Sequence, residues 1–321
     1  MDFIKEYTYF LEQEIKAIKF ASSPANLYDP LSYFLTLGGK RMRPMATLVA
    51  GDLFGASIEK TKYAALAIEL FHNFSLIHDD IMDKAPLRRG KVTVHEKWND
   101  NIAILSGDVL FVKAYELLSK NDIKYLVPLL SCFNRTAIEV CEGQQLDMDF
   151  EKIDEVSLED YLKMIRLKTS VLLGAAFEMG AIIGEASIEN TKLIYDFGVN
   201  LGIAFQIQDD LLDLYGETEK VGKQKGGDIL ADKKTILSIL AKMHGNESDL
   251  KALAEIKGEK NGEKKINHTL VIFEKLAIKE KCISKMNEYY ETAEKSLDSI
   301  KIDNSKENLY ALFQLLKLRQ Y

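Results

Sequence analysis

Proline is scarce and unevenly placed in this chain of 321 residues. The five prolines stand at positions 24, 30, 44, 86 and 128, and none follows in the last 193 residues. Because proline breaks helix interiors, long helices are permitted along almost the whole chain. Apolar residues recur at intervals of three and four, as in Leu66, Leu70, Phe74 and Ile77, and do not alternate. We therefore expect an all-α fold that forms a single domain over residues 1–321, and we find no convincing β-hairpin signal.

Composition excludes several classes of protein. Hydrophobic residues make up 47% and charged residues 28% of the chain, which is sufficient for a large core and excludes a disordered or collagen-like protein. The net charge of −7 argues against nucleic-acid binding through a general basic field. Three cysteines without a Cys-x-x-Cys pair predict neither a disulfide framework nor a zinc–thiolate site. The first residues lack the order of a signal peptide, and no apolar run approaches 18 residues, so we expect a cytoplasmic protein without a membrane span.

Two short aspartate-rich motifs recur 130 residues apart. The first is His78-Asp79-Asp80-Ile81-Met82-Asp83, and the second is Gln208-Asp209-Asp210-Leu211-Leu212-Asp213. In each motif the first and last aspartates are four positions apart, so they share one face of a helix. Mg²⁺ prefers oxygen ligands and commonly combines one or two carboxylates with water and substrate phosphate oxygens. Two such clusters in otherwise apolar helices therefore predict a magnesium-dependent diphosphate site, whereas one cluster alone is equally well a solvated acidic helix end.

Basic residues that could bind the same diphosphate lie near these motifs or in apolar helices. Gly38-Gly39-Lys40-Arg41-Met42-Arg43-Pro44 combines a flexible turn with three cations before an expected helix start. Arg88 and Arg89 follow the first aspartate motif and can bind phosphate bidentately. His72 is seven residues before Asp79, about 20° away around an ideal helix. These positions predict basic groups directed at anionic substrates; taken singly, the Gly-Gly-Lys-Arg stretch is also consistent with an ordinary basic loop, and a lone histidine such as His72 is more often structural.

Taken together, these motifs resemble the trans-isoprenyl diphosphate synthases, the polyprenyl synthetase family. The resemblance covers nearly the whole chain and rests on motifs that follow the family's order and spacing: Gly-Gly-Lys-Arg-x-Arg-Pro, Ser75-Leu76-Ile77-His78-Asp79-Asp80-x-x-Asp83, Arg88-Arg89-Gly90, Lys168-Thr169, Phe205-Gln206-x-Gln208-Asp209-Asp210-x-x-Asp213 and Gly222-Lys223. It implies the all-α isoprenoid synthase type I fold with a central catalytic cavity, usually in a homodimer. It also implies head-to-tail condensation of isopentenyl diphosphate with an allylic diphosphate, with Mg²⁺ as cofactor and three ions per active site.

The resemblance also implies roles for individual residues. Asp79, Asp83 and Asp209 would be direct Mg²⁺ ligands, supported by Asp80, Asp210 and Asp213. The allylic diphosphate would be held by Arg88, Lys168, Thr169, Gln206, Lys223 and Lys233, and isopentenyl diphosphate by Lys40, Arg43, His72 and Arg89. The stretch before Asp228 is one residue longer than in some relatives, so Lys234 is an alternative to Lys233. Thr169 and Gln206, with Lys168, would serve as catalytic residues beside the allylic cation.

Product length would be set by residues just before the first aspartate motif, again by resemblance. Phe74 and Ser75, preceded by Phe71, are those positions, and one aromatic beside one small residue implies a short-chain enzyme. We expect geranylgeranyl diphosphate as the product, with farnesyl diphosphate next. On an ideal helix Ser75 lies about 40° from the aspartate face and Phe74 about 140°, so the assignment of Phe74 depends more on resemblance than on geometry.

Two other readings remain open at the level of sequence. A class I terpene cyclase also uses an aspartate-rich helix and Mg²⁺, but its second metal motif would carry Ser or Thr where this chain has Asp213. A non-catalytic subunit of a hetero-oligomeric prenyl synthase would be free to lose its aspartates, whereas this chain keeps six.

Overall fold

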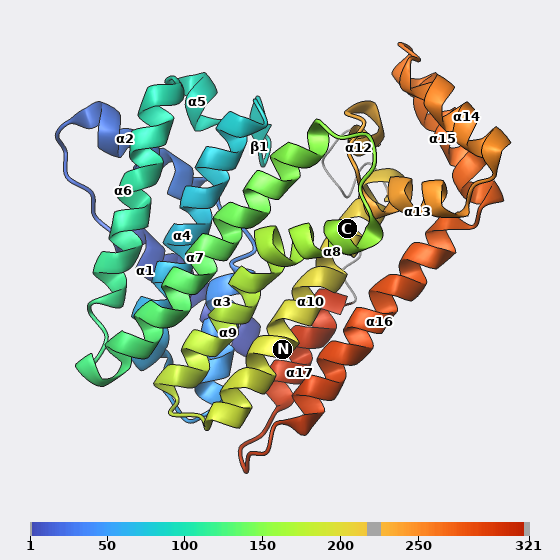
Figure 1. The fold of residues 1–321 in the computed structure, drawn as a ribbon. Helices are drawn as coiled ribbons and strands as arrows, with labels where there is room; N and C mark the ends of the chain where they lie inside the picture. The colour runs from blue at the N-terminus through green and yellow to red at the C-terminus, as the bar shows by residue number, and fades with distance from the viewer. Residues whose placement is uncertain (1, 217–225, 318–321) are drawn as a thin grey trace. The chain divides into compact units, whose positions relative to one another are not determined.

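The computed structural model describes residues 2–216 and 226–317, which are almost entirely helical (Figure 1). In chain order the elements are α1 (Asp2–Ala17), α2 (Ala25–Thr36), α3 (Met42–Leu53), α4 (Ile58–Met82), β1 (Leu87–Arg88), β2 (Lys91–Val92), α5 (Val94–Lys97), α6 (Asp100–Leu118), α7 (Ile123–Glu151), α8 (Leu158–Ile165), the π-helical turn η1 (Arg166–Ser170), α9 (Val171–Ile183), α10 (Ile188–Tyr215), α12 (Gly227–Leu230), α13 (Ile236–His244), α14 (Glu247–Lys257), α15 (Gly262–Lys275), α16 (Ile278–Ser299) and α17 (Glu307–Lys317). The expected all-α class is confirmed.

The chain divides into two compact units, each assembled from separate stretches. The first unit contains Met1–Ala137, Leu172–Gly198 and Ser299–Leu315, and the second contains Ile138–Val171, Val199–Asp298 and Leu316–Tyr321. The long helices α7 and α10 each contribute to both units. Because neither unit is a continuous segment, composition along the chain could not have revealed the division.

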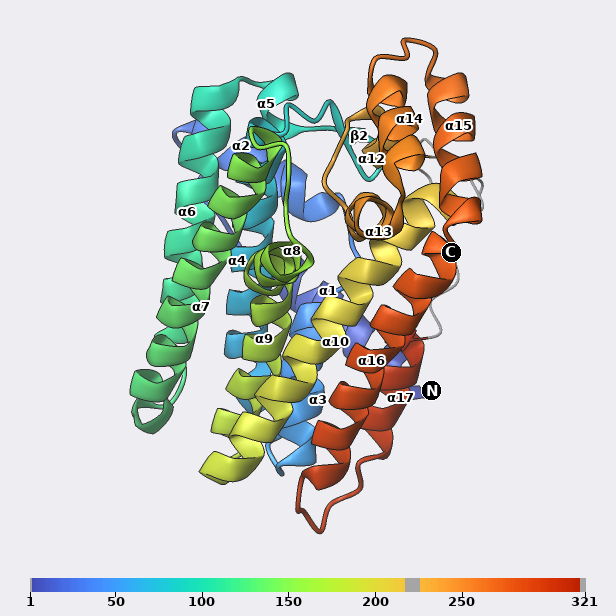
Figure 2. The same ribbon diagram turned by 45° about the vertical axis from the view of Figure 1, so that its right-hand side comes forward.

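Helix α4 is the central element of the first unit. It packs against α3 and α6, and Figure 2 shows α6 and the first part of α7 running beside it. Small residues such as Ala64 and Ala67 are fully buried along α4 and permit close approach of its neighbours. Since α4 is enclosed along most of its length and ends at the first aspartate motif, the core of this unit fixes the position of that motif.

A small β-hairpin follows α4, contrary to the sequence expectation. β1 and β2 pair antiparallel, with Leu87 opposite Val92 and Arg88 opposite Lys91. The two turn residues, Arg89 and Gly90, have φ values of 53° and 73°, as a two-residue type I′ turn requires. Sequence inspection missed it because each strand is two residues long and arginine is unusual at the first turn position.

The second unit places α8, η1 and the C-terminal part of α10 with the shorter helices α12 to α15. Ser157 caps α8 by accepting a hydrogen bond of 3.0 Å from the backbone N–H of Asp160. Helices α14 and α15 lie side by side (Figure 2). The second aspartate motif lies in the last two turns of α10, as expected.

Two further observations bear on the sequence expectations. No helix in residues 2–216 and 226–317 is both long and apolar enough to cross a membrane. Cys132 and Cys282 are buried and Cys141 is exposed, and all three are free thiols.

Candidate functional site

The first aspartate motif combines one buried carboxylate with two more accessible ones. Asp80 is almost fully buried and accepts hydrogen bonds of 2.8 Å from the Arg88 guanidinium at both carboxylate oxygens. Arg88 also reaches Asp79 at 3.4 Å. Asp83 caps the end of α4 and is exposed. The outer carboxylates, Asp79 and Asp83, are therefore more exposed than Asp80, which fixes Arg88.

Burial raises the pKa of the Asp80 carboxyl, and the hydrogen bonds and charge of Arg88 oppose this rise. The contact with Arg88 thus stabilises the charged form of the Asp80 carboxyl, whereas burial alone would favour its protonated, neutral form. Because Arg88 lies in β1, the hairpin that sequence inspection missed is what carries this guanidinium to the end of α4.

The structure brings together three of the four residues expected to bind isopentenyl diphosphate. Arg43 contacts the His72 imidazole, with 3.3 Å between Nη1 and Nε2. A methyl group at Gly39, where φ is 152°, would lie 2.9 Å from the Arg89 guanidinium, so the glycine turn lets the backbone approach that group. Burial and then the charges of Arg43 and Arg89 hold the pKa of His72 well below its ordinary value. His72 is therefore a neutral group within a cationic cluster.

Lys40 and Arg41 behave differently although they are adjacent. Lys40 is exposed. Arg41 is buried: its guanidinium donates to Glu69 at 2.5 Å and to Glu12 at 2.8 Å. Arg41 adopts a left-handed backbone conformation with φ of 50°, which turns its side chain inward. One of the three cations in the Gly-Gly-Lys-Arg-x-Arg-Pro motif is thus structural, and nothing in the sequence distinguishes it from its neighbours.

The second aspartate motif repeats the pattern of the first. Asp210 is buried and accepts a 2.6 Å hydrogen bond from the Tyr161 hydroxyl and a 3.3 Å bond from the backbone N–H of Ile236. Burial raises the pKa of Asp210 to about 7 despite these hydrogen bonds. Asp209 and Asp213 are partly exposed. Both motifs therefore use the central carboxylate for internal contacts and keep the outer pair accessible.

Lys168 and Thr169 lie on η1, in contact with partners from two other helices. The Lys168 ammonium donates to Asp147 on α7 at 2.5 Å, and the Thr169 hydroxyl donates to Gln206 on α10 at 3.3 Å. Gln206 in turn donates to Asp210 at 3.2 Å. The structure thus links Thr169 through Gln206 to the second aspartate motif, and adds Asp147 and Tyr161, which sequence reasoning missed.

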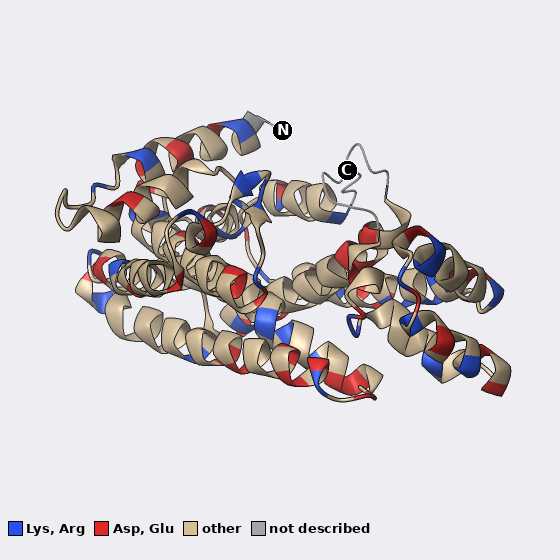
Figure 3. Cartoon of the chain, turned by 90° about the horizontal axis from the view of Figure 1, so that it is seen from above, with Lys and Arg blue, Asp and Glu red and all other residues tan. Residues whose placement is uncertain are grey.

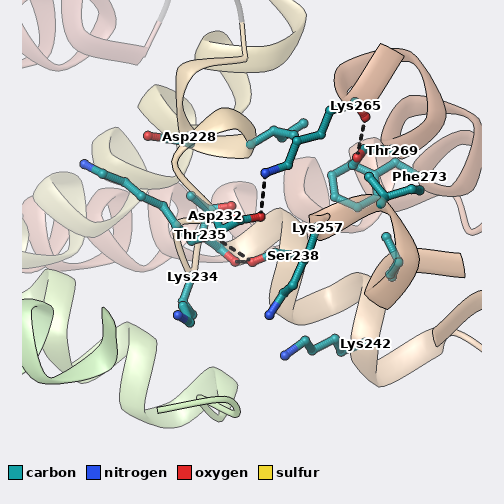
Figure 4. A pocket seen from close by; sticks show the side chains of 14 residues that line it. Asp228, Asp232, Lys234, Thr235, Ser238, Lys242, Lys257, Lys265, Thr269 and Phe273 are labelled. Atoms are coloured by element: carbon teal, nitrogen blue, oxygen red, sulfur yellow. Dashed lines mark hydrogen bonds and ion pairs between the residues drawn. The ribbon is translucent and has the colours of Figure 1, made fainter. Parts of the chain in front are cut away.

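The basic residues after the second motif are only partly described. Lys223 lies outside the described residues. Lys233 is exposed and lines a partly open cavity of about 90 Å³ formed by residues of α12 to α15; Figure 4 shows this cavity. In that cavity the Lys265 ammonium pairs with Asp232 at 2.9 Å, while Lys234 donates to the backbone carbonyl of Glu151 at 3.3 Å. Both Lys233 and Lys234 therefore lie at this cavity.

An aromatic cluster surrounds the positions expected to control product length. Phe74 stacks on Phe111 of α6, with ring centroids 4.9 Å apart and planes at 13°. Phe71 packs edge-on against Phe133 of α7 at 5.3 Å. Ser75 donates a hydrogen bond back to the carbonyl of His72 at 2.9 Å. Phe111 and Phe133 escaped sequence analysis because they come from helices far along the chain, where apolar periodicity alone marks them as core.

The carboxylates fit magnesium without forming a complete cage. Within residues 2–216 and 226–317, no three His, Cys, Asp or Glu side chains converge closely enough to hold a metal ion. Pairs of accessible carboxylates one helical turn apart suit Mg²⁺, which fills its remaining positions with water and phosphate oxygens. In the view of Figure 3, acidic and basic residues are interspersed along the helices, so specific clusters must bind anionic ligands.

Comparison with known proteins gives a consistent result. The family model described as "Polyprenyl synthetase" matches residues 24–273. The geranylgeranyl diphosphate synthase of Methanosarcina mazei is 40% identical over 252 residues, which cover 78% of each chain. The short chain isoprenyl diphosphate synthase of Methanocaldococcus jannaschii is 42% identical over 262 residues, covering 81% of this chain and 79% of that protein.

A solved structure shows the same similarity over nearly the whole length. The geranylgeranyl pyrophosphate synthetase from Pyrococcus horikoshii aligns with a TM-score of 0.93 and 34% sequence identity, covering 99% of this chain and 97% of that one. The comparisons of sequence and of structure therefore identify the same group of proteins.

Proposed function

Since this chain belongs to the polyprenyl synthetase family, we propose that it condenses isopentenyl diphosphate with allylic diphosphates to give a short-chain trans-prenyl diphosphate. The observation that carries this proposal is the repeated arrangement of the two aspartate motifs: a buried central carboxylate and an accessible outer pair in each. Geranylgeranyl diphosphate is the favoured product and farnesyl diphosphate the next. The relatives named above are diphosphate synthases, so no observation favours a terpene cyclase or a non-catalytic subunit.

The reaction breaks one carbon–oxygen bond and forms one carbon–carbon bond. The bond between C1 of the allylic substrate and its diphosphate breaks, and the diphosphate leaves with the electron pair. The alkene of isopentenyl diphosphate supplies the two electrons of the new bond to C1. The new bond leaves a cationic carbon on the former isopentenyl unit, and a proton is then lost from the carbon next to it. Because no His/Asp base pair stands out among the described residues, the departing diphosphate is the proposed proton acceptor.

Negative charge develops on the leaving diphosphate, and stabilising that charge is the main catalytic requirement. Bound Mg²⁺, proposed at three ions per active site, supplies Lewis-acid stabilisation of this charge. Asp79, Asp83 and Asp209 are the proposed direct ligands, since these carboxylates are accessible or partly so. Asp80, Asp210 and Asp213 support them: Asp80 fixes Arg88, and Asp213 accepts the backbone N–H of Asp228 at 3.1 Å.

Charged and polar side chains bind the two substrates. Arg88, Lys168, Lys223 and Lys233 would hold the allylic diphosphate, and the hydroxyl of Thr169 and the amide of Gln206 would present oxygen dipoles to the allylic cation. Lys40, Arg43, His72 and Arg89 would hold isopentenyl diphosphate. The neutral state of His72 suits a hydrogen-bonding role beside these cations.

The aromatic cluster supports a short product. We propose that Phe71, Phe74 and Ser75 limit elongation, together with Phe111, whose ring stacks directly on Phe74. A stacked pair from two helices resists displacement by a growing chain better than one ring, because aromatic pairs add about 0.5–1.5 kcal/mol beyond simple burial.

The assembly and location are also proposals. Apolar side chains on α6 and α7, including Leu105 and Val127, are exposed at 58% and 76% in the single chain, which supports a homodimer that covers them. We propose that the enzyme works in the cytoplasm, where its charged diphosphate substrates dissolve.

Product analysis tests the proposed function. Purified protein would be incubated with Mg²⁺, labelled isopentenyl diphosphate and, separately, dimethylallyl, geranyl or farnesyl diphosphate, and the dephosphorylated alcohols resolved by chain length. We expect a twenty-carbon or fifteen-carbon product that disappears with a chelator and in the Asp79→Asn and Asp209→Asn variants. Folded wild-type protein that elongates no primer would reject the synthase assignment and bring the two alternatives forward.

A further inference from the structure

The segment that carries Lys168 and Thr169 is an interruption in a longer helix. Between α8 and α9, the backbone N–H of Val171 bonds to the carbonyl of Arg166, five residues earlier, where an α-helix would use a four-residue step. The Ser170 hydroxyl donates to the carbonyl of Ile165 at 3.2 Å, again five residues back. Such a π-bulge inserts one residue into an α-helix and occurs frequently at functional sites.

Two glycines on neighbouring helices lie directly against this bulge. A methyl group at Gly143 of α7 would overlap the backbone of Lys168 and lie 2.6 Å from the carbonyl carbon of Leu167. A methyl group at Gly202 of α10 would lie 2.7 Å from Cα and 2.8 Å from Cβ of Ser170. Neither glycine has a positive φ, so close approach, and not backbone conformation, is what requires glycine at both positions.

Each glycine precedes, by one helical turn, the side chain that contacts the bulge. Asp147 follows Gly143 by four residues and accepts the Lys168 ammonium at 2.5 Å. Gln206 follows Gly202 by four residues and accepts the Thr169 hydroxyl at 3.3 Å. Residues four apart share one face of a helix, so the surface that approaches the bulge also carries its polar partner. A glycine inside a helix lowers stability by about 0.5–1 kcal/mol relative to alanine. The close approach to the bulge explains why glycine stands at both positions despite this cost.

We propose that Gly143 and Gly202 are positioning residues for prenyl transfer, which admit the π-bulge and thereby fix Lys168 and Thr169 in the orientation that binds the allylic diphosphate. This inference rests on the proposed function. Neither glycine contacts substrate; both act through the backbone of η1. A methyl group at either position would push η1 away from Asp147 or Gln206 and so misplace the two side chains together.

Kinetics with separately varied substrates tests this proposal. Gly202→Ala and Gly143→Ala are expected to raise KM for the allylic diphosphate about tenfold and to lower kcat, because displacements on the order of 1 Å cost catalysis heavily. KM for isopentenyl diphosphate should stay within about twofold of wild type, since its proposed ligands lie on other elements. Gly202→Ala has the less severe overlap and decides the result if Gly143→Ala does not fold.

Gly180→Ala is the matched control for lost helix packing. Gly180 lies on α9, where a methyl group would come 2.8 Å from Cβ of Ala50 and from the backbone nitrogen of Gly51. It would also overlap the backbone oxygen of Thr47, so the overlap is more severe than at Gly202 and comparable to that at Gly143, but it lies away from η1. This variant should lose stability while both KM values stay within about twofold of wild type. Equal allylic KM values in Gly202→Ala and Gly180→Ala would overturn the proposal.

A second-site change makes the test sharper. Ser170→Gly removes the Cβ and Oγ atoms that a methyl group at position 202 would meet at 2.8 and 3.0 Å. Added to Gly202→Ala, it should recover part of the allylic KM relative to Gly202→Ala, after correction for the single Ser170→Gly variant. Absence of any coupling between the two sites would contradict direct contact with the bulge as the cause.

Hydrogen–deuterium exchange separates failure of this proposal from failure of the proposed function. In Gly202→Ala the peptide covering residues 165–171 should exchange faster than in wild type, and in Gly180→Ala it should not. This readout needs no substrate. If the wild-type protein is inactive but the variants show the expected exchange pattern, prenyl transfer is rejected, while the proposal that the two glycines admit the π-bulge is supported. Unchanged exchange in Gly202→Ala would reject the proposal that Gly202 admits the π-bulge.

Discussion

His72 is surrounded by guanidinium groups that keep its imidazole uncharged. Burial is the largest cause of its lowered pKa, followed by the charges of Arg43, Arg89, Arg88 and Arg41. In the unfolded chain the imidazole has its ordinary pKa of about 6.5. Below that pH the unfolded chain therefore binds a proton at His72 that the folded chain does not bind. The contribution of His72 to stability is therefore fully present above about pH 6.5 and declines as the pH falls below this value.

The decline of the His72 contribution to stability at low pH can be measured. The free energy of unfolding of wild type minus that of His72→Gln should fall by about 1 kcal/mol per pH unit below pH 6.5. Urea denaturation between pH 5.5 and 8 measures both proteins, and the other histidines cancel in the difference. A difference that is flat with pH would show that folding leaves the pKa of His72 unchanged, and one that grows on acidification would show that folding raises it; either result would contradict the lowered pKa.

The stacked pair of Phe74 and Phe111 should control product length jointly. Phe74→Ala and Phe111→Ala are each expected to lengthen the product by at least one five-carbon unit, because each removes one ring of the stack. The double variant should give a longer distribution than either single variant. Chromatography of the dephosphorylated products measures the length.

Phe177→Ala is the control for loss of a buried aromatic ring. Phe177 packs against Phe197 at 5.1 Å and, within residues 2–216 and 226–317, makes no ring contact with the cluster around Phe74. It should cost about 3–5 kcal/mol of stability and leave the product unchanged. If Phe111→Ala leaves the product ladder unchanged, α6 does not contribute to the limit and Phe74 acts alone or not at all.

At the scale of elements, Arg41 joins helices that lie apart in sequence. Its guanidinium contacts Glu12 of α1 and Glu69 of α4 and donates to the carbonyl of Leu35 of α2 at 3.3 Å. Asn73 adds a 3.1 Å hydrogen bond to the same Glu69 carboxylate. This network fixes the turn that carries Lys40 and Arg43 against the helix that carries His72.

Breaking the Arg41 network should be costly. Arg41→Met leaves the buried Glu69 charge without its partner, and we expect a loss of about 3–5 kcal/mol in the free energy of unfolding. Lys62→Met is the matched control, because the Glu59 carboxylate in its 2.8 Å pair is 65% exposed, and such a partly exposed pair should contribute less than about 1 kcal/mol. Urea denaturation compares the two. Equal losses would mean that Arg41 is no more important than a surface cation.

The elements also show where sequence reasoning reaches its limit. The two aspartate motifs were predictable because spacing of four residues fixes a shared helix face. The π-bulge was not, since its sequence, Arg166 to Ser170, differs in no visible way from an ordinary helical turn, and the glycines that lie against it, Gly143 and Gly202, are on other helices. The hairpin at Arg89-Gly90 was missed because its strands are only two residues long and arginine is unusual at the first turn position.

At the scale of the whole molecule, the all-α class followed from proline distribution and apolar periodicity, but the division into two units did not. Each unit draws on three separate stretches, and no composition change marks where α7 or α10 passes from one to the other. Likewise, the partners of the candidate site residues, Asp147 for Lys168 and Tyr161 for Asp210, depend on tertiary packing. Local pattern predicts which residues carry the chemistry, and packing decides how each is held.

The proposed homodimer depends on apolar side chains that the single chain leaves uncovered. On α6, Leu105 and Val112 are 58% and 64% exposed and lie seven residues apart, hence on one face; on α7, Ile123 and Val127 are 78% and 76% exposed and lie one turn apart. The two helices are joined through Phe133, which packs against Tyr115 at 4.9 Å, so both faces belong to one unit. Isologous dimers bury the same surface from each copy, and contiguous apolar patches on a monomer are uncommon.

Charge introduced on this surface should therefore dissociate the dimer. Leu105→Glu combined with Val112→Glu is expected to halve the mass measured by sedimentation equilibrium at micromolar concentration, since each subunit would bury two unpaired carboxylates at the contact. Ile188→Glu is the control: Ile188 is 92% exposed at the start of α10, and its replacement should leave the mass unchanged. A wild-type protein that sediments as a monomer, or a double variant that stays dimeric, would place the subunit contact elsewhere or remove it.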